Sequence, residues 1–185
     1  MTPFDEITEP TELEALVGFF DLTGFMRLAQ KPEPVELLQL MAGYFELTQD
    51  IIETGGGWLV KTIGDAGLAA FPTEETDTGV RTMLRLKEEG DAWLAARDLR
   101  SEAVVKLHVG TVACGMVAGR RDIYGHAINL AAVMDSTGFA MSSQTFRKLA
   151  PETRKLFKKH TSPVSYIPIE AAHPRDGQRG WRSNM

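Results

Sequence analysis

Two kinds of apolar pattern follow each other in the first third of the chain. A short apolar run at 15–20 ends at Asp21 and predicts a buried strand. Beyond two prolines, apolar residues recur at helical spacing from Val35 to Ile52, which predicts an amphipathic helix of about five turns. A run of three glycines then ends this helix.

The middle of the chain repeats these two patterns. The expected elements are a hairpin of residues 58–60 and 68–71, a helix that begins at Thr76 or Asp77, and strands at 105–109 and 111–118. Up to the strand at 105–109, the order β-α-β-β-α-β is the split βαβ arrangement of ferredoxin-like folds. We therefore expect an α+β fold with a ferredoxin-like core.

The last third of the chain adds further elements to this core. We expect a short helix at 127–135, a longer helix at 143–157 and a strand at 164–169. The chain thus divides into three parts: an N-terminal segment at 1–14, one domain at 15–170 and a flexible C-terminal tail at 171–185.

Composition narrows the class of protein. With 43% hydrophobic and 24% charged residues, the chain has the composition of a folded globular protein, and its net charge of −5 disfavours nucleic acid as a partner. No apolar run reaches the roughly 18–20 residues of a membrane-spanning helix. The acidic N-terminus lacks the order of a signal peptide, and the single cysteine forms no internal disulfide. We therefore expect a cytoplasmic protein that binds neither nucleic acid nor a membrane.

Basic residues gather between positions 146 and 160, where six lysines and arginines accompany one glutamate. We expect them to form the solvent-exposed face of the C-terminal helix. The alternative is a contact for phosphate or for an acidic partner.

Two aspartates fall where this topology brings strand ends together. Asp21 ends the first strand and Asp65 precedes the third, and these strands are antiparallel neighbours in the split βαβ sheet. Facing carboxylates repel each other, and oxygen ligands suit Mg²⁺ or Mn²⁺ shared with a phosphorylated substrate. Backbone N–H groups of the turn at Thr23 and Gly24 can approach phosphate oxygens. Taken singly, each aspartate is better explained as a turn residue, but together they favour a metal site.

Four motifs carry a family resemblance. They are FFDLTGF at 19–25, KTIGD at 61–65, LHVG at 107–110, and the stretch from DIYGHAINLA at 122–131 to MDSTG at 134–138. In this order and spacing, the chain resembles class III nucleotidyl cyclases over residues 15–157. The resemblance implies an adenylate cyclase, in which the ribose 3′-oxygen of ATP attacks the α-phosphate to give cyclic AMP and pyrophosphate.

The resemblance also implies the metal and phosphate ligands. Asp21 and Asp65, with the Leu22 carbonyl, are expected to hold two Mg²⁺ or Mn²⁺ ions per site. The turn formed by Thr23, Gly24 and Phe25 is expected to bind the substrate.

The family's nucleotide-reading residues are matched as well. Lys61 and Asp122 match the pair that reads the purine, where a lysine donates to adenine N1 and an aspartate accepts from the 6-amino group. Asn129 matches the asparagine that orients the ribose. In the family the metal aspartates come from one subunit and these residues from the other, so the resemblance implies a homodimer with two equivalent sites.

One position departs from the family pattern at the transition state. Four residues beyond Asn129, the family has an arginine aimed at the phosphate, and this chain has Val133. Loss of such an arginine costs on the order of 10³-fold in rate. Arg120 and Arg121, in the nearby loop, are the candidate substitutes.

Two further departures leave two hypotheses. The segment Gly115–Asp122 is shorter than the family's dimerisation arm, which predicts weak or altered pairing, and Lys158 or Lys159 would have to replace a phosphate-binding lysine. The first hypothesis is a working but slow adenylate cyclase. The second is a catalytically inactive relative that binds nucleotide or only dimerises. The matched polar residues favour the first hypothesis, and Val133 favours the second.

Overall fold

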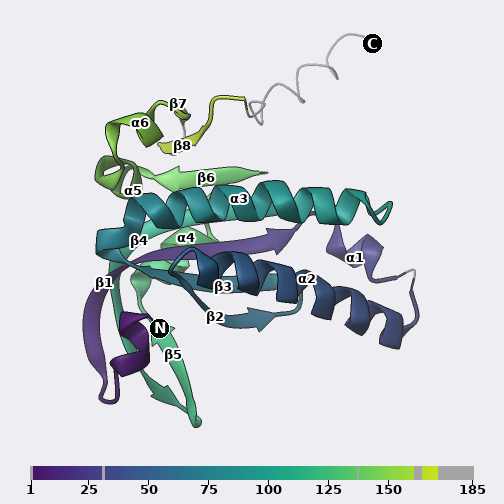
Figure 1. Ribbon diagram of the computed structural model, residues 1–185, viewed down its shortest axis with the longest axis horizontal. Helices are drawn as coiled ribbons and strands as arrows, with labels where there is room; N and C mark the ends of the chain where they lie inside the picture. The colour runs from purple at the N-terminus through teal and green to yellow at the C-terminus, as the bar shows by residue number, and fades with distance from the viewer. Residues whose placement is uncertain (1, 31, 137, 161–163, 171–185) are drawn as a thin grey trace, which may run out of the picture.

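The computed structural model describes residues 2–30, 32–136, 138–160 and 164–170, so the predicted tail at 171–185 lies outside the described residues. A mixed β-sheet forms the centre of the molecule (Figure 1). Helices α2 (Pro34–Thr54) and α3 (Thr76–Ala95) cover one face of the sheet, and α4 (His126–Ala132) packs on the other. This architecture confirms the predicted α+β fold.

The other elements are mostly short. The remaining helices are α1 (Phe25–Leu28), α5 (Ser143–Lys148), α6 (Pro151–Arg154) and two 3-10 turns, Pro3–Glu6 and Thr73–Glu75. The strands are β1 (Thr11–Leu22), β2 (Trp58–Ile63), β3 (Ala66–Pro72), β4 (Ala103–Val117), β5 (Arg120–Tyr124), β6 (Phe139–Ser142), β7 (Phe157–His160) and β8 (Ser165–Pro168). Their order in the sheet is β2-β3-β1-β4-β6-β8-β7, with β5 paired to β4. Within the part of the chain described here, no helix has the length and apolarity needed to cross a bilayer.

Strand β1 lies at the centre of the predicted core. It pairs antiparallel with β3 on one side and with β4 on the other. Leu16 and Phe20 face α2 and α3, whereas Ala15 and Val17 face α4, because alternate residues of a strand point to opposite faces. Burial on both faces explains why the sequence shows a continuous apolar run here. The strand begins at Thr11, four residues before the expected run.

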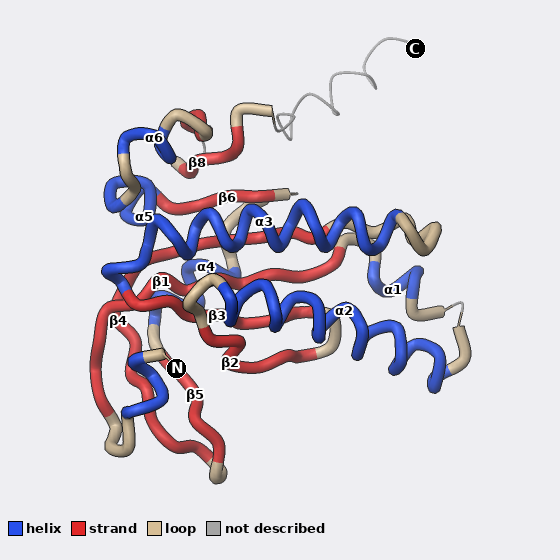
Figure 2. Tube along the Cα trace, viewed as in Figure 1, coloured by secondary structure: helices blue, strands red, loops and turns tan. Residues whose placement is uncertain are grey.

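Strand β4 differs from the prediction. The strands expected at 105–109 and 111–118 are one strand, because Gly110 continues the ladder opposite Ala15 of β1. Beyond this ladder, β4 and β5 form a hairpin that extends away from the helices (Figure 2). Its turn holds Ala118 and Gly119, both with left-handed backbone angles.

Helix α3 begins without the predicted cap. Thr76 is its first residue, and the Thr76 hydroxyl donates to the Thr73 carbonyl at 2.6 Å. Asp77 accepts a hydrogen bond from the Ala150 N–H at 2.8 Å, so it anchors the segment before α6 instead. Glu75 stands at the N-cap position, but its side chain accepts from the Thr78 hydroxyl at 3.1 Å and caps no backbone N–H of the helix.

The C-terminal third needed most correction. The helix expected at 143–157 is two short helices, and Pro151, which has no N–H to donate, begins the second. Strand β8 confirms the strand expected at 164–169. Strands β6 and β7 were not predicted, and β7 begins at Phe157, where the expected helix was to end. The six basic residues of this region are exposed, as expected, but they are spread over α5, α6, the residue that follows it, and β7.

Gly67 tests the packing between β1 and β3. It stands opposite Phe20, and a Cβ at this position would lie 2.2 Å from the fully buried Phe20 ring. We expect Gly67→Ala to lower the free energy of unfolding by about 1–3 kcal/mol in urea denaturation, because the enclosed ring has little room to move. Gly115→Ala is the matched control, since its nearest contact would be an ordinary 3.4 Å. Equal stability of the two variants would contradict this packing.

Candidate active site

Asp21 and Asp65 meet at the end of β1. Asp65 lies in the turn between β2 and β3, and the pairing of Phe20 with Gly67 sets this turn beside the end of β1. The Leu22 N–H donates to Asp65 Oδ2 at 3.2 Å. The structure thus brings together the two carboxylates that strand order predicts to converge.

The charges at this edge are not balanced. Burial raises the pKa of Asp21, the positive charge of Lys106 opposes that rise, and the negative charge of Asp65 adds to it. The described residues contain no group of three or more His, Cys, Asp and Glu side chains that could hold a metal ion. A cation between Asp21 and Asp65 would therefore need further oxygen ligands from the backbone, water or a substrate.

The turn after β1 is held by residues that precede β4. The Thr23 N–H donates to the Glu102 carbonyl at 2.9 Å, and the Thr23 hydroxyl accepts from the Glu102 N–H at 2.9 Å. The Ser101 hydroxyl donates to the Thr23 carbonyl at 2.7 Å. Gly24 then takes a left-handed conformation with φ 64°, and Phe25 begins α1. The Thr23 side chain thus fixes the shape of the turn that follows Asp21 and Leu22 along the chain.

Lys61 and Asp122 form an ion pair between β2 and β5. Lys61 Nζ lies 2.6 Å from Asp122 Oδ2, with side-chain exposures of 34% and 15%. The other carboxylate oxygen accepts the Ile123 N–H at 2.8 Å, which orients the carboxylate. The Tyr124 ring lies 5.1 Å from Lys61 Nζ, within the range of a cation–π contact. Two residues 61 positions apart in sequence are therefore brought together, as the resemblance implies for the purine-reading pair.

Asn129 and Val133 lie one helical turn apart on α4. The Val133 N–H donates to the Asn129 carbonyl at 3.0 Å, so the two side chains share a face of the helix. Both are exposed, and Val133 is 77% exposed. At the position where the family has its arginine, this chain thus exposes the apolar side chain of Val133 to solvent.

Large apolar side chains are exposed around these groups. They lie at the end of β2, on the β4–β5 hairpin and on or beside α4: Ile63, Met116, Val117, Tyr124, Leu130 and Val133. Exposed apolar residues on neighbouring elements are typical of a surface that another chain covers.

The candidate substitutes for the missing arginine, and for the missing phosphate-binding lysine, are engaged elsewhere or lie apart. The Arg121 guanidinium binds the Asp5 carboxylate at 3.3 Å and the Asp5 carbonyl at 2.9 Å, so it holds the N-terminal 3-10 turn and not α4. Arg120 begins β5, at the turn of the hairpin. Lys158 donates to the Ile169 carbonyl at 2.7 Å on the far strand of the sheet, and Lys159 is its exposed neighbour.

Lys106 is a charged residue near the carboxylates that no motif indicated. Its Nζ donates to the carbonyl of Ala132, the last residue of α4, at 3.2 Å. The available signal in the sequence was a lysine inside an apolar strand, which alternation alone explains equally well.

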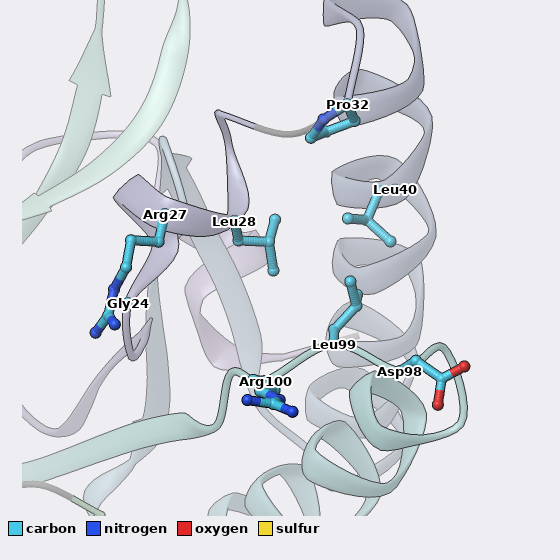
Figure 3. A pocket seen from close by; sticks show the side chains of 8 residues that line it. All are labelled: Gly24, Arg27, Leu28, Pro32, Leu40, Asp98, Leu99 and Arg100. Atoms are coloured by element: carbon cyan, nitrogen blue, oxygen red, sulfur yellow. The ribbon is translucent and has the colours of Figure 1, made fainter.

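A cavity of about 850 Å³ opens beside the turn that follows β1. In Figure 3, Leu28, Leu40 and Leu99 point into the same space, with Arg27 and Arg100 at its margin. Neither carboxylate lines this cavity, so it is separate from the acidic edge.

Comparison with known proteins identifies the family of the chain. Residues 8–165 match the sequence-family model of the adenylate and guanylate cyclase catalytic domain. An adenylate cyclase of Streptomyces coelicolor is 35% identical over 129 residues, which are 69% of this chain and 31% of that protein. Receptor-type guanylate cyclase gcy-23 of Caenorhabditis elegans is 30% identical over 134 residues, covering 66% of this chain and 12% of that one. The chain thus spans about a third or less of the length of these curated relatives.

Solved structures show the same fold. A bacterial light-regulated adenylyl cyclase superposes with a TM-score of 0.79 at 24% identity, over 93% of this chain and 56% of that one. The adenylyl cyclase CyaB from P. aeruginosa superposes with a TM-score of 0.69 at 17% identity, over 89% and 98%. Since the family model covers most of the sequence and the resemblance to class III nucleotidyl cyclases is confirmed, the chain belongs to the adenylate and guanylate cyclase catalytic domain family.

Proposed function

We propose that the chain is a cytoplasmic adenylate cyclase domain that converts ATP to cyclic AMP and pyrophosphate as a homodimer. The observation that carries the proposal is the convergence of Asp21 and Asp65 at one strand end, with Leu22 held against Asp65. Both adenylate and guanylate cyclases are among the relatives, so the choice of base rests on the residues that face it.

The acidic edge fits Mg²⁺ or Mn²⁺. Its donors are carboxylate oxygens, the ligands that these ions prefer. Burial raises the pKa of Asp21, and the negative charge of Asp65 adds to that rise, so a bound cation would stabilise the ionised carboxylate. Asp21, Asp65 and the Leu22 carbonyl would hold two ions. When bound, such ions neutralise the triphosphate and lower the pKa of an attacking hydroxyl. Gly24 and Phe25 would position the phosphates beside this edge.

The Lys61–Asp122 pair suits adenine. In the free protein the two side chains satisfy each other at 2.6 Å. An entering adenine offers an acceptor at N1 to the lysine and a donor at the 6-amino group to the aspartate. Guanine offers the reverse pattern, which would leave buried polar groups unpaired, and such mismatches discriminate strongly.

Two chains are needed for one complete site. In Figure 1 the end of β1, which carries Asp21, lies well away from the β4–β5 hairpin, whose strand β5 carries Asp122. A head-to-tail homodimer would bring the acidic edge of one chain to the Lys61, Asp122 and Asn129 of the other. The exposed apolar side chains on β2, the hairpin and α4 support such pairing.

A second candidate function is a nucleotide-binding or dimerising module without turnover. Val133 favours it, because a neutral side chain cannot stabilise charge that develops on a phosphoryl group.

Cyclase activity separates the two candidates. With ATP and Mn²⁺ or Mg²⁺, we expect the purified protein to form cyclic AMP, detected by chromatography, and Asp65→Ala to abolish it. Glu46→Gln, which changes an exposed carboxylate on α2, is the matched control and should keep wild-type activity. Activity per chain should fall on dilution if the site lies between two chains. ATP binding without product at high protein concentration would establish the inactive module.

Asp21 is expected to destabilise the metal-free protein. Its pKa is raised in the folded state, so its ionised form opposes folding at neutral pH, and stability should recover as the pH falls through that raised pKa toward the ordinary pKa of an aspartate. Without metal at pH 7, Asp21→Asn should therefore raise the melting temperature by roughly 1–4 °C. Adding Mn²⁺ should raise the melting temperature of the wild type and not of the variant. A less stable Asp21→Asn protein in chelator would refute this account of the edge.

Val133 limits turnover in this proposal. We expect Val133→Arg to raise kcat at least tenfold, because it supplies a cation one turn from Asn129 where phosphoryl charge develops. Steady-state kinetics with ATP measures the change, and Val133→Met, similar in length and uncharged, controls for side-chain size. No gain with arginine would show that this position does not face the phosphate.

A further inference from the structure

Strand β4 carries a lysine where its neighbours are buried. Residues 103–105 and 107–109 are all buried, whereas Lys106 between them is partly exposed. An ammonium group so close to the core is costly unless it finds partners. Its partners therefore indicate what it does.

The first partner is the acidic edge. Lys106 stands opposite Phe19 in the β1–β4 ladder, and Asp21 follows two residues later on the same face of β1. Such diagonal positions lie about 7–8 Å apart, within reach of a long side chain. In agreement with this geometry, the charge of Lys106 lowers the pKa of Asp21.

The second partner is the end of α4. Lys106 Nζ donates to the Ala132 carbonyl at 3.2 Å, and the C-terminal end of a helix attracts cations. No ion pair among the described residues includes Lys106, and an ammonium group has two more N–H donors to offer. The helix end thus holds the charge near the carboxylates without a carboxylate in contact to neutralise it.

We infer that Lys106 is a built-in cation of the acidic edge, which weakens the binding of divalent ions by Asp21 and Asp65 and thereby sets the metal concentration that the site requires. The inference rests on the proposed function, because it assumes that the edge binds metal. A fixed positive charge beside two carboxylates both reduces their attraction for a divalent ion and repels that ion directly.

The same ammonium could instead bind a phosphate of the nucleotide. Its anchor on Ala132 favours the first role, because the charge is present and held in the free protein, where no phosphate is bound. The two roles differ in their effect on metal binding without nucleotide, which only the built-in cation alters.

Mn²⁺ binding to the nucleotide-free protein tests the inference directly. Electron paramagnetic resonance reports free Mn²⁺ during a titration, and we expect Lys106→Met to bind Mn²⁺ roughly 3–30-fold more tightly than the wild type. Lys106→Arg keeps the charge and should bind like the wild type. Lys155→Met, at an exposed lysine after α6, makes the same change in net charge far from the edge and should also bind like the wild type. The gain should shrink as NaCl is added, a dependence that a merely structural role would not produce.

The outcomes separate this inference from the function on which it rests. Equal or weaker Mn²⁺ binding by Lys106→Met, in a protein that still melts cooperatively, overturns the inference. The proposed metal site survives that result if Asp65→Ala still abolishes Mn²⁺ binding. If neither the wild type nor Lys106→Met binds Mn²⁺, the metal site fails and the inference fails with it. Lys106→Gln serves in the same comparison if the methionine variant does not fold.

Discussion

Antiparallel pairing between β1 and β3 places two like charges side by side, and the candidate site depends on this constraint. The register that sets Phe20 against Gly67 leaves Asp65 no position other than beside the end of β1, where it accepts the Leu22 N–H. Burial of the Asp21 carboxylate and its repulsion from Asp65 oppose folding, and close packing of the buried ring against the glycine helps to hold them in place. A site that attracts cations thus exists because the surrounding core is stable enough to maintain it.

The two halves of the candidate site differ in how their charges are satisfied. Lys61 and Asp122 are a matched pair that needs nothing added in the free protein. Asp21 and Asp65 carry like charges, and burial together with the charge of Asp65 raises the pKa of Asp21 against the opposing charge of Lys106. A purine would take the place of the contact between Lys61 and Asp122. Cations bound to a triphosphate would supply the positive charge between Asp21 and Asp65. This difference suits a division of labour, in which one half selects the base and the other binds the phosphates.

The end of helix α4 brings Val133 and the ammonium group of Lys106 close together in the structure. Val133 follows the last residue of the helix and presents an apolar side chain to solvent. The carbonyl just before it, on Ala132, holds the ammonium group of Lys106. The positive charge near the end of α4 therefore comes from Lys106 of the sheet. The helix face that carries Asn129 has no such charge at position 133. Charge at that position acts on the carboxylates of the same chain.

The sequence by itself determined the elements long enough to show a period and the motifs they carry. The apolar run of β1, the helix from Pro34 to Thr54 and the β2–β3 hairpin were all visible, and their order was enough to predict that Asp21 and Asp65 converge. Only the tertiary structure decided the rest. The short strands β6 and β7 form because neighbouring strands offer edges to pair with, and β4 runs through Gly110 because β1 continues opposite it. The partners of Arg121 and Lys106 were equally hidden, because a long side chain binds whatever the fold brings within its reach, and local sequence patterns do not record contacts between distant segments.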